Sequence, residues 1–246
     1  MAPGAGAAPD LEPSHVADLF DRNAATYDRI NTILTFGLDA RWRRWAARQA
    51  APRAAESSAP PARVLDACAG TGLLALDLAG RGATVTAADA APRMLAVARY
   101  RLAAAGLPLR AFVADLSDPH VADKLGGPFD AITLGFGLRY FADPGAMLRP
   151  LRGLLASGGR LVVVEAVQPP RDVVGTAAGL YFFRAAPRLG AALAGRAELY
   201  DFLAASTRAL GSADDVAAHL RAARFVVAVR RRFAGGVVAG FVARPG

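Results

Sequence analysis

Three aspartates and a short glycine-rich stretch stand out as residues that could bind a ligand. The stretch DACAGTG runs from Asp66 to Gly72, directly after an apolar run that is typical of a buried strand. Gly70 and Gly72 carry no Cβ, so a ligand can lie against their backbone, and the following helix offers free N–H groups. We therefore expect a binding loop here, although a tight strand-to-helix turn would use the same residue types.

Two further carboxylates end the next two apolar runs. Asp89 lies seventeen residues past Gly72, where a carboxylate can accept hydrogen bonds from both hydroxyls of a ribose. Asp115 ends the third run, where it can meet the amino group of an adenine. Ligands of open α/β sheets bind outside the carboxyl ends of the strands. The loop and the two carboxylates therefore predict an adenosine-containing cofactor, with NAD and S-adenosylmethionine both open.

The elements that must position these residues alternate between strand and helix, which predicts a parallel sheet with right-handed crossovers. The strands are continuously apolar, as expected when helices cover both faces of the sheet. A final apolar stretch, residues 224–245, predicts two antiparallel strands joined through Gly235 and Gly236. The expected strands are 63–68, 83–89, 109–115, 129–137 and 160–166, and the expected helices are 14–29, 38–50, 72–79, 91–106 and 144–159.

These elements predict one doubly wound α/β domain over residues 14–246, preceded by a disordered tail at residues 1–13. Residues 14–50 would form a helical cap, and residues 171–222 a helical insertion on the substrate side.

Composition narrows the class of protein further. The 246-residue chain is 54% hydrophobic and has a net charge of +8, which favours anionic partners such as membrane surfaces, nucleic acid or acidic ligands. A single cysteine, Cys68, excludes an intrachain disulfide, and three histidines outside any ligand cluster argue against a metal site. The first ten residues lack the features of a signal peptide, and no apolar run is long enough to span a membrane. We expect a cytoplasmic protein.

Longer motifs resemble those of the ubiquinone/menaquinone biosynthesis C-methyltransferases. Residues 16–44 are similar to the family signature F-x-x-x-A-x-x-Y-D-x-x-N, followed by F-G and a tryptophan. Residues 129–169 are similar to its central block, which contains F-G-L-R and G-G-R-L. The resemblance covers about residues 16–241. It implies a Rossmann-like class I fold with a seven-stranded, mostly parallel sheet, and S-adenosylmethionine as the cofactor.

The same resemblance assigns residues to the cofactor site. The loop residues Asp66, Gly70, Thr71 and Gly72 match the family's D-x-x-x-G-T-G pattern. Tyr27 of the cap would close over the sulfonium. The remaining cofactor contacts would be Asp89, Asp115, Leu116 and the backbone at Gly135.

The implied reaction moves a methyl group to a ring carbon of a reduced quinone. The candidates for the reacting end of the site are Arg139, Tyr140 and Glu165. Arg139 would stabilise a phenolate oxygen rather than act as a base, because a guanidinium stays protonated. Tyr140 stands where the family has asparagine, and Ala166 where it has phenylalanine, so both could reshape the ring pocket.

Three functions stay open at this point. The first is methylation of a prenyl quinol, with peripheral contact to the inner face of the membrane around residues 173–195 and no nucleic acid partner. The second is methylation of a soluble aromatic or polyketide metabolite by an enzyme of the same lineage. The third is a basic, non-enzymatic module, which would need neither Asp89 nor the Thr71–Gly72 turn. A homodimer is compatible with the first two.

Overall fold

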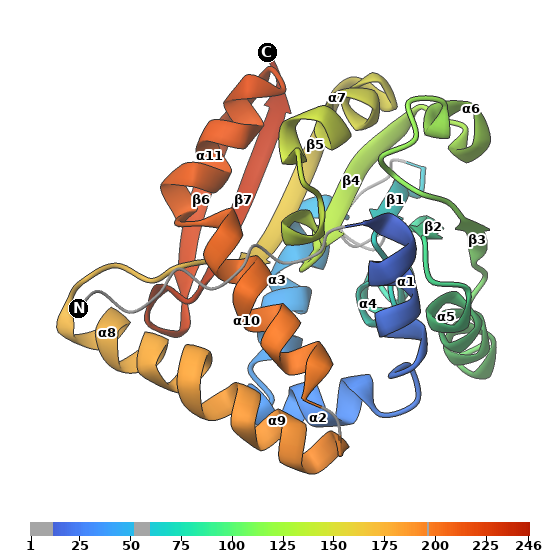
Figure 1. Cartoon of the computed structure of the whole chain (residues 1–246). Coiled ribbons are helices and arrows are strands. Elements are labelled where there is room, and N and C mark those ends of the chain that lie inside the picture. The colour runs from blue at the N-terminus through green and yellow to red at the C-terminus, as the bar shows by residue number, and fades with distance from the viewer. Residues whose placement is uncertain (1–11, 52–59, 196) are drawn as a thin grey trace.

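Apolar segments spaced along the whole chain assemble into one seven-stranded sheet in the computed structural model (Figure 1), which describes residues 12–51, 60–195 and 197–246. The strand order is β3-β2-β1-β4-β5-β7-β6, in which β1 to β5 are parallel and β7 is antiparallel to both of its neighbours. The predicted fold class is confirmed. The strands are β1 (Arg63–Ala67), β2 (Thr84–Asp89), β3 (Arg110–Val113), β4 (Phe129–Gly135), β5 (Leu155–Ala166), β6 (Phe225–Phe233) and β7 (Val238–Pro245).

Helices cover both faces of the sheet and thereby bury its apolar strands. On one face, α6, α7 and α11 pack against side chains such as Leu65 and Ile132. On the other face, α3 and α4 pack against Val64, Val162 and their neighbours. The helices are α1 (Pro13–Asp21), α2 (Tyr27–Leu34), α3 (Asp39–Ala50), α4 (Leu73–Ala79), α5 (Pro92–Ala104), α6 (Val121–Leu125), α7 (Pro144–Gly153), α8 (Val173–Leu180), α9 (Ala186–Ala194), α10 (Glu198–Leu210) and α11 (Ala213–Ala222).

A third group of buried residues, the cap cluster, lies away from the sheet. It joins α1 and α2 to the start of α5 and to α10, over the carboxyl edge of the parallel strands (Figure 1). Phe20, Ile30, Met94 and Phe202 are among its buried members. The cap is therefore held by aromatic and aliphatic packing above the edge where a ligand would bind.

Two predicted helix boundaries are wrong. The expected helix 14–29 is divided at residues 22–26, where the Asn23 side chain donates to the Leu19 carbonyl at 2.7 Å and the chain turns. The expected helix 144–159 ends at Gly153, and β5 begins at Leu155, which pairs with Phe129. An apolar Leu-Leu pair suits helix and strand alike, so only the neighbouring strand decides its structure.

The segment between β5 and β6 is helical, as expected, but its helices lie in two different layers of the fold. Helices α8 and α9 are joined by a π-helical turn, Tyr181–Ala185, and lie at the cap side with α10. In contrast, α11 packs on the sheet beside β6 and α7. Most of the predicted tail, residues 1–11, lies outside the described residues. None of the described helices combines the length and apolar character needed to cross a membrane.

Candidate active site

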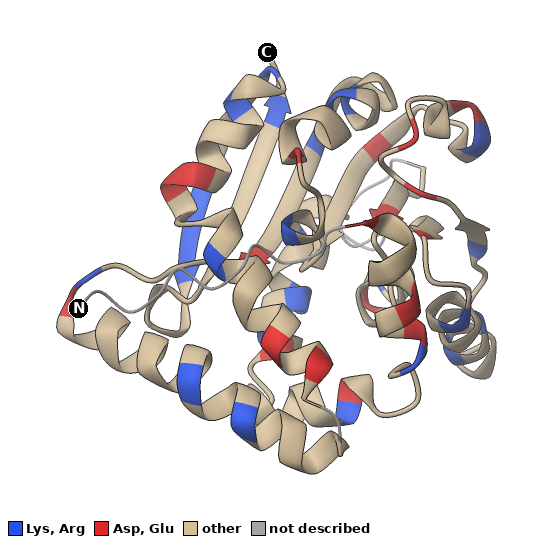
Figure 2. Cartoon of the chain, in the orientation of Figure 1, with Lys and Arg blue, Asp and Glu red and all other residues tan. Residues whose placement is uncertain are grey.

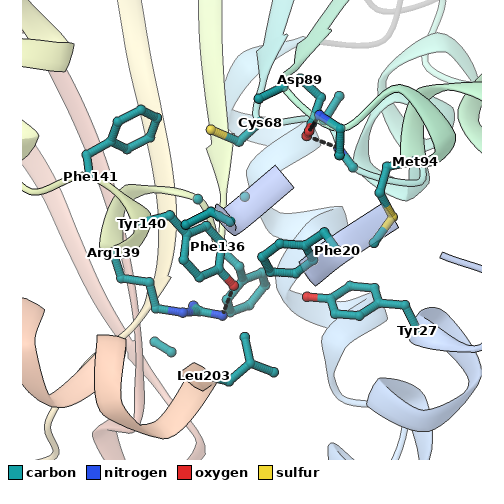
Figure 3. Close-up of a pocket in the computed structure, with 18 of the residues that line it drawn as sticks. Phe20, Tyr27, Cys68, Asp89, Met94, Phe136, Arg139, Tyr140, Phe141 and Leu203 are labelled. Atoms are coloured by element: carbon teal, nitrogen blue, oxygen red, sulfur yellow. Dashed lines mark hydrogen bonds between the residues drawn. The ribbon is translucent and has the colours of Figure 1, made fainter. Parts of the chain in front are cut away.

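A cavity of about 910 Å³ lies between the carboxyl edge of the parallel strands and the cap (Figure 3). The ends of β1, β2 and β4 form one side, and α1, α2, α9 and α10 contribute to the other. Gly72 and Glu165, both predicted as site residues, are absent from its wall. The other predicted residues line it: Tyr27, Asp66, Gly70, Thr71, Asp89, Asp115, Leu116, Gly135, Arg139 and Tyr140.

The two glycines of the loop have different roles. Gly70 has φ +53°, and a Cβ there would meet nothing within 4 Å, so its bare backbone faces open space on the cavity wall. Gly72 has φ +76°, and a Cβ there would lie 2.6 Å from the Ala98 Cβ on α5. The first glycine therefore leaves room for a ligand, whereas the second lets α4 begin close against α5.

Asp89 is held rigidly at the end of β2. Its Oδ2 accepts from the Gly70 N–H at 2.7 Å, and its Oδ1 accepts from the Ala91 N–H at 2.9 Å (Figure 3). Burial raises the pKa of the Asp89 carboxyl, and the two N–H groups oppose that rise. Each oxygen can accept a further hydrogen bond, so the carboxylate can bind vicinal hydroxyls such as those of a ribose.

Asp66 places a buried carboxyl group on the cavity wall. Its Oδ1 accepts from the Thr133 hydroxyl at 2.7 Å, while its buried Oδ2 has no partner among the described residues. Asp66 lines the cavity, and burial raises the pKa of its carboxyl to about 7, against the opposing effect of the Thr133 hydroxyl. An unpartnered buried carboxylate oxygen is costly unless a donor reaches it. An ammonium group, such as that of the methionine part of S-adenosylmethionine, fits this position.

The Asp66 pKa predicts how cofactor affinity depends on pH. An ammonium ligand favours the ionised carboxylate, so affinity should be constant above about pH 7 and fall about tenfold per pH unit below it. Calorimetry across this range measures the effect, and Asp66→Asn should give weak, nearly pH-independent binding. A flat profile for the parent protein would contradict this role. In the free protein the same raised pKa makes the free energy of unfolding decrease as pH rises from 3.8 to about 7, because the folded state holds the proton more tightly.

A polar cluster that was not predicted from the sequence connects the cap to the glycine loop. Arg101 of α5 forms an ion pair with Asp28 of α2 at 2.6 Å and also donates to the Thr71 carbonyl. The Thr71 hydroxyl donates to the other Asp28 oxygen at 2.7 Å. Since Asp28 directly follows Tyr27, this cluster fixes where Tyr27 enters the cavity. The Tyr-Asp pair of the N-terminal motif was a signal for Asp28, but nothing marked Arg101.

We expect Arg101→Gln to raise the KM for the cofactor about tenfold or more, because charge-assisted hydrogen bonds to the loop and the cap are lost. Hydrogen exchange over residues 27–34 should become faster. Arg99→Gln is the matched control, since Arg99 lies on the same helix but donates to the Ala111 carbonyl at 2.7 Å. Steady-state kinetics that do not distinguish the two variants would show that the cluster has no part in cofactor binding.

Asp115, Leu116 and Gly135, which are also predicted to contact the cofactor, line the cavity as well. The Asp115 Oδ1 accepts from the Ser117 N–H at 2.8 Å and from the Ser117 hydroxyl at 2.6 Å, which leaves Oδ2 for a ligand. Leu116 is buried, and Gly135 ends β4. Cys68 also lines the cavity, and burial raises the pKa of its thiol well above the usual value. It is therefore a neutral thiol rather than a nucleophile.

Aromatic rings close the cap side of the cavity. Tyr140 stacks on Phe202 of α10 with centroids 5.7 Å apart, and it contacts Phe20 of α1 at 5.0 Å. Phe20 also meets Tyr27 edge-on at 5.4 Å (Figure 3). Burial raises the pKa of both tyrosine hydroxyls. Both hydroxyls are therefore neutral near pH 7, so neither tyrosine is a ready proton acceptor.

Arg139 and Glu165 form a buried ion pair beside this aromatic group. The Arg139 Nη1 donates to Glu165, and its Nη2 donates to the Tyr140 hydroxyl at 2.6 Å. Glu165 is fully buried and also accepts from the backbone N–H groups of Leu138 and Ala166. Burial disfavours the Arg139 charge, but the neighbouring Tyr140 and Glu165 outweigh it and raise the pKa of the guanidinium. Arg139 is thus a permanent cation on the cavity wall, while Glu165 orients it from behind.

Comparisons with known proteins point to one family. The model of the ubiE/COQ5 methyltransferase family matches residues 9–244. A demethylmenaquinone methyltransferase of Thermus thermophilus is 42% identical over 211 residues, 85% of this chain and 92% of that protein. One of Clavibacter sepedonicus is 38% identical over 229 residues, 93% of this chain and 89% of that protein.

Solved structures share the fold. The magnesium protoporphyrin IX methyltransferase of Synechocystis PCC 6803, with bound SAH, has a TM-score of 0.65 at 20% identity, over 96% of this chain and 100% of that one. The mitomycin 7-O-methyltransferase has a TM-score of 0.59 at 17% identity, over 92% of this chain and 60% of that one.

The fold and the site together define a class I methyltransferase that depends on S-adenosylmethionine. Within that class, the chain belongs to the ubiE/COQ5 methyltransferase family. The resemblance drawn from its motifs is therefore confirmed, and a non-enzymatic module is excluded.

Proposed function

We propose that this enzyme methylates a ring carbon of a reduced prenyl quinone, such as a demethylmenaquinol. The relatives that carry the name demethylmenaquinone methyltransferase support this substrate class. S-adenosylmethionine supplies the methyl group when bound, and Asp66, Gly70, Asp89 and Asp115 are the residues that would hold it.

The observation that carries the proposal is the position of Arg139. Its Nε–H is buried and has no partner among the described residues, and Arg139 lies on the wall of a cavity lined largely by apolar side chains. A quinol is an apolar ring with two hydroxyls, and its ring carbons become strongly nucleophilic when a neighbouring hydroxyl loses its proton. A fixed guanidinium stabilises that phenolate in a site of low polarity. With the cofactor bound, the ring carbon would take the methyl group as the methyl–sulfur bond breaks and S-adenosylhomocysteine leaves, and the ring proton would pass to water.

Two wall residues shape the space for the ring. Tyr140 fills the side toward α1 and α10, and Ala166 ends β5 with a small side chain. Both line the cavity. Together with Phe20, they suit a flat bicyclic ring better than an extended polar substrate.

The test is methyl transfer from labelled cofactor to a panel of reduced quinones and phenolic metabolites, followed by mass analysis of the product. We expect incorporation on a ring carbon of a naphthoquinol. The panel includes soluble aromatic and polyketide phenols, so turnover restricted to those compounds, or a methyl group found on oxygen, would overturn the proposal.

A further inference from the structure

Exposed apolar side chains are concentrated at one edge of the molecule. Among the described residues, seven of the eleven large hydrophobic side chains that are exposed lie at the end of α2 or on α8 and α9. We call this set the apolar face: Ile33, Phe36, Val173, Val174, Leu180, Leu189 and Leu193. Contiguous exposed apolar surface on a folded protein usually marks a binding surface.

Two contacts join the end of α2 to the turn between α8 and α9. The Tyr181 hydroxyl donates to the Leu34 carbonyl at 2.8 Å, and the rings of Phe36 and Tyr181 lie 5.4 Å apart. Phe36 is 75% exposed although its φ is +53°, an unfavourable backbone conformation for a bulky residue. Most of its ring is therefore accessible to a partner.

Within α8 and α9 the charges have one sign, and the exposed Asp172 directly precedes these helices. Residues 173–195 contain Arg184 and Arg188, both exposed, and no aspartate or glutamate. Figure 2 shows blue bands and no red band between the parts of the ribbon that Figure 1 labels α8 and α9. Arg184 lies one helical turn after Leu180 on the exposed side, and Arg188 one turn further. Apolar residues that surround exposed arginines are typical of helices that lie in a lipid interface.

The same elements line the cavity from inside. Leu34 and Thr35, at the end of α2, and Phe182, Ala186 and Pro187, around the start of α9, line the cavity. The two elements also contact each other, and both carry members of the apolar face.

We propose that the apolar face lies against an anionic lipid bilayer, and that a lipid substrate enters the cavity between α2 and α9. The substrate part of this inference rests on the proposed function, whereas the docking part does not. A second copy of this chain is a poorer occupant. A two-fold interface centred on this face would bring the arginines of one copy toward those of the other. An anionic headgroup layer complements them instead.

The first test is flotation with vesicles of phosphatidylcholine alone or mixed with phosphatidylglycerol. The parent protein should float with the mixed vesicles and much less with the neutral ones. Leu180→Asp should weaken binding about tenfold or more, because it places a carboxylate in the interface. Val226→Asp is the matched control, since Leu180 is 56% exposed and Val226, on β6, is 60% exposed. Phe36→Asp tests the same face from α2, should Leu180→Asp fail to fold.

Charge is tested separately. Replacing Arg184 and Arg188 by glutamine should weaken binding to the mixed vesicles about fivefold for each arginine. Arg149→Gln, an exposed position on α7, should leave binding unchanged. Binding that responds equally to all these variants, no binding by the parent protein, or a dimer that dissociates on Leu180→Asp would overturn the docking proposal.

A comparison of substrates separates this inference from the proposed function. Leu180→Asp should slow methylation of a prenylated quinol in vesicles but keep parental turnover on a water-soluble quinol without a tail. Equal loss on both substrates would contradict access from the bilayer. Absence of turnover by the parent protein on both would refute the quinol substrate and leave the vesicle result standing.

Discussion

Replacing Arg139 by alanine is expected to lower turnover about 100- to 1,000-fold, because a donor that stabilises developing charge is lost. The same change should reduce the free energy of unfolding by about 3 kcal/mol. Arg139 is 6% exposed and Glu165 is completely buried, so removing the guanidinium leaves a buried carboxylate without its counter-ion. The loss falls at the lower end of the usual range because two backbone N–H groups still bind Glu165. Cofactor affinity, measured by calorimetry, should stay near that of the parent.

A double variant separates the two roles of Arg139. Arg139→Met combined with Glu165→Leu removes both charges together and should recover most of the lost stability, since apolar pairs can replace buried ion pairs. Turnover should remain low, because the cation at the cavity wall is still absent. If turnover recovers with stability, Arg139 acts only in the fold, and the reacting oxygen is stabilised by another group.

Gly72→Ala is expected to destabilise the protein by about 2–5 kcal/mol. The alanine would hold a left-handed backbone conformation, which costs about 1–2 kcal/mol, and its Cβ would lie 2.6 Å from the Ala98 Cβ, which adds about 1–3 kcal/mol of overpacking. Chemical denaturation with and without Ala98→Gly measures most of the second part, since the smaller residue removes the 2.6 Å contact and leaves only the Cα of residue 98, at 3.0 Å. No coupling between the two positions would contradict this role.

Unlike Gly72→Ala, Gly70→Ala should mainly lower cofactor affinity and have a smaller effect on stability. It costs only the backbone conformation, about 1–2 kcal/mol, because the space around its Cβ is open. That space is part of the cavity, so cofactor affinity should fall by at least about tenfold. Equal effects of the two substitutions on stability would show that the glycines are interchangeable.

Much of the fold was predictable because its signals are local. Alternating apolar runs and amphipathic helices predicted the five parallel strands and the antiparallel pair, and carboxylates at strand ends predicted Asp89 and Asp115 at one edge. The break at residues 22–26 involves a local bond from the Asn23 side chain to the Leu19 carbonyl, but an asparagine alone does not mark a helix end. The boundary at residues 153–155 depends on pairing with Phe129, a tertiary interaction that has no signature in a short window of sequence.

Most of the residues predicted for the site line the cavity, but the sequence did not distinguish the positions that they take there. Gly70 and Gly72 look alike in sequence, and only the position of Ala98, on another helix, distinguishes them. Glu165 was a candidate for the reacting end of the site together with Arg139, yet it lies behind the cavity wall. Arg101 could not be inferred because its partners, Asp28 and Thr71, are distant along the chain and meet it only after folding.

The position of β7 determines the order in which the parts of the chain can become stable during synthesis. β7 follows every other strand in the sequence, yet it lies between β5 and β6 in the sheet. Its Gly240 leaves no room for a Cβ because the Trp45 ring of α3 lies against it, 2.5 Å from where that atom would be. A nascent chain that has not yet released Val238–Pro245 from the ribosome lacks an interior strand and the part of the α3 packing surface around Gly240. The contact between Trp45 and Gly240 therefore forms only after this strand has emerged, and a chain halted before Val238 would leave the edge of β5 unpaired and accessible to chaperones and proteases.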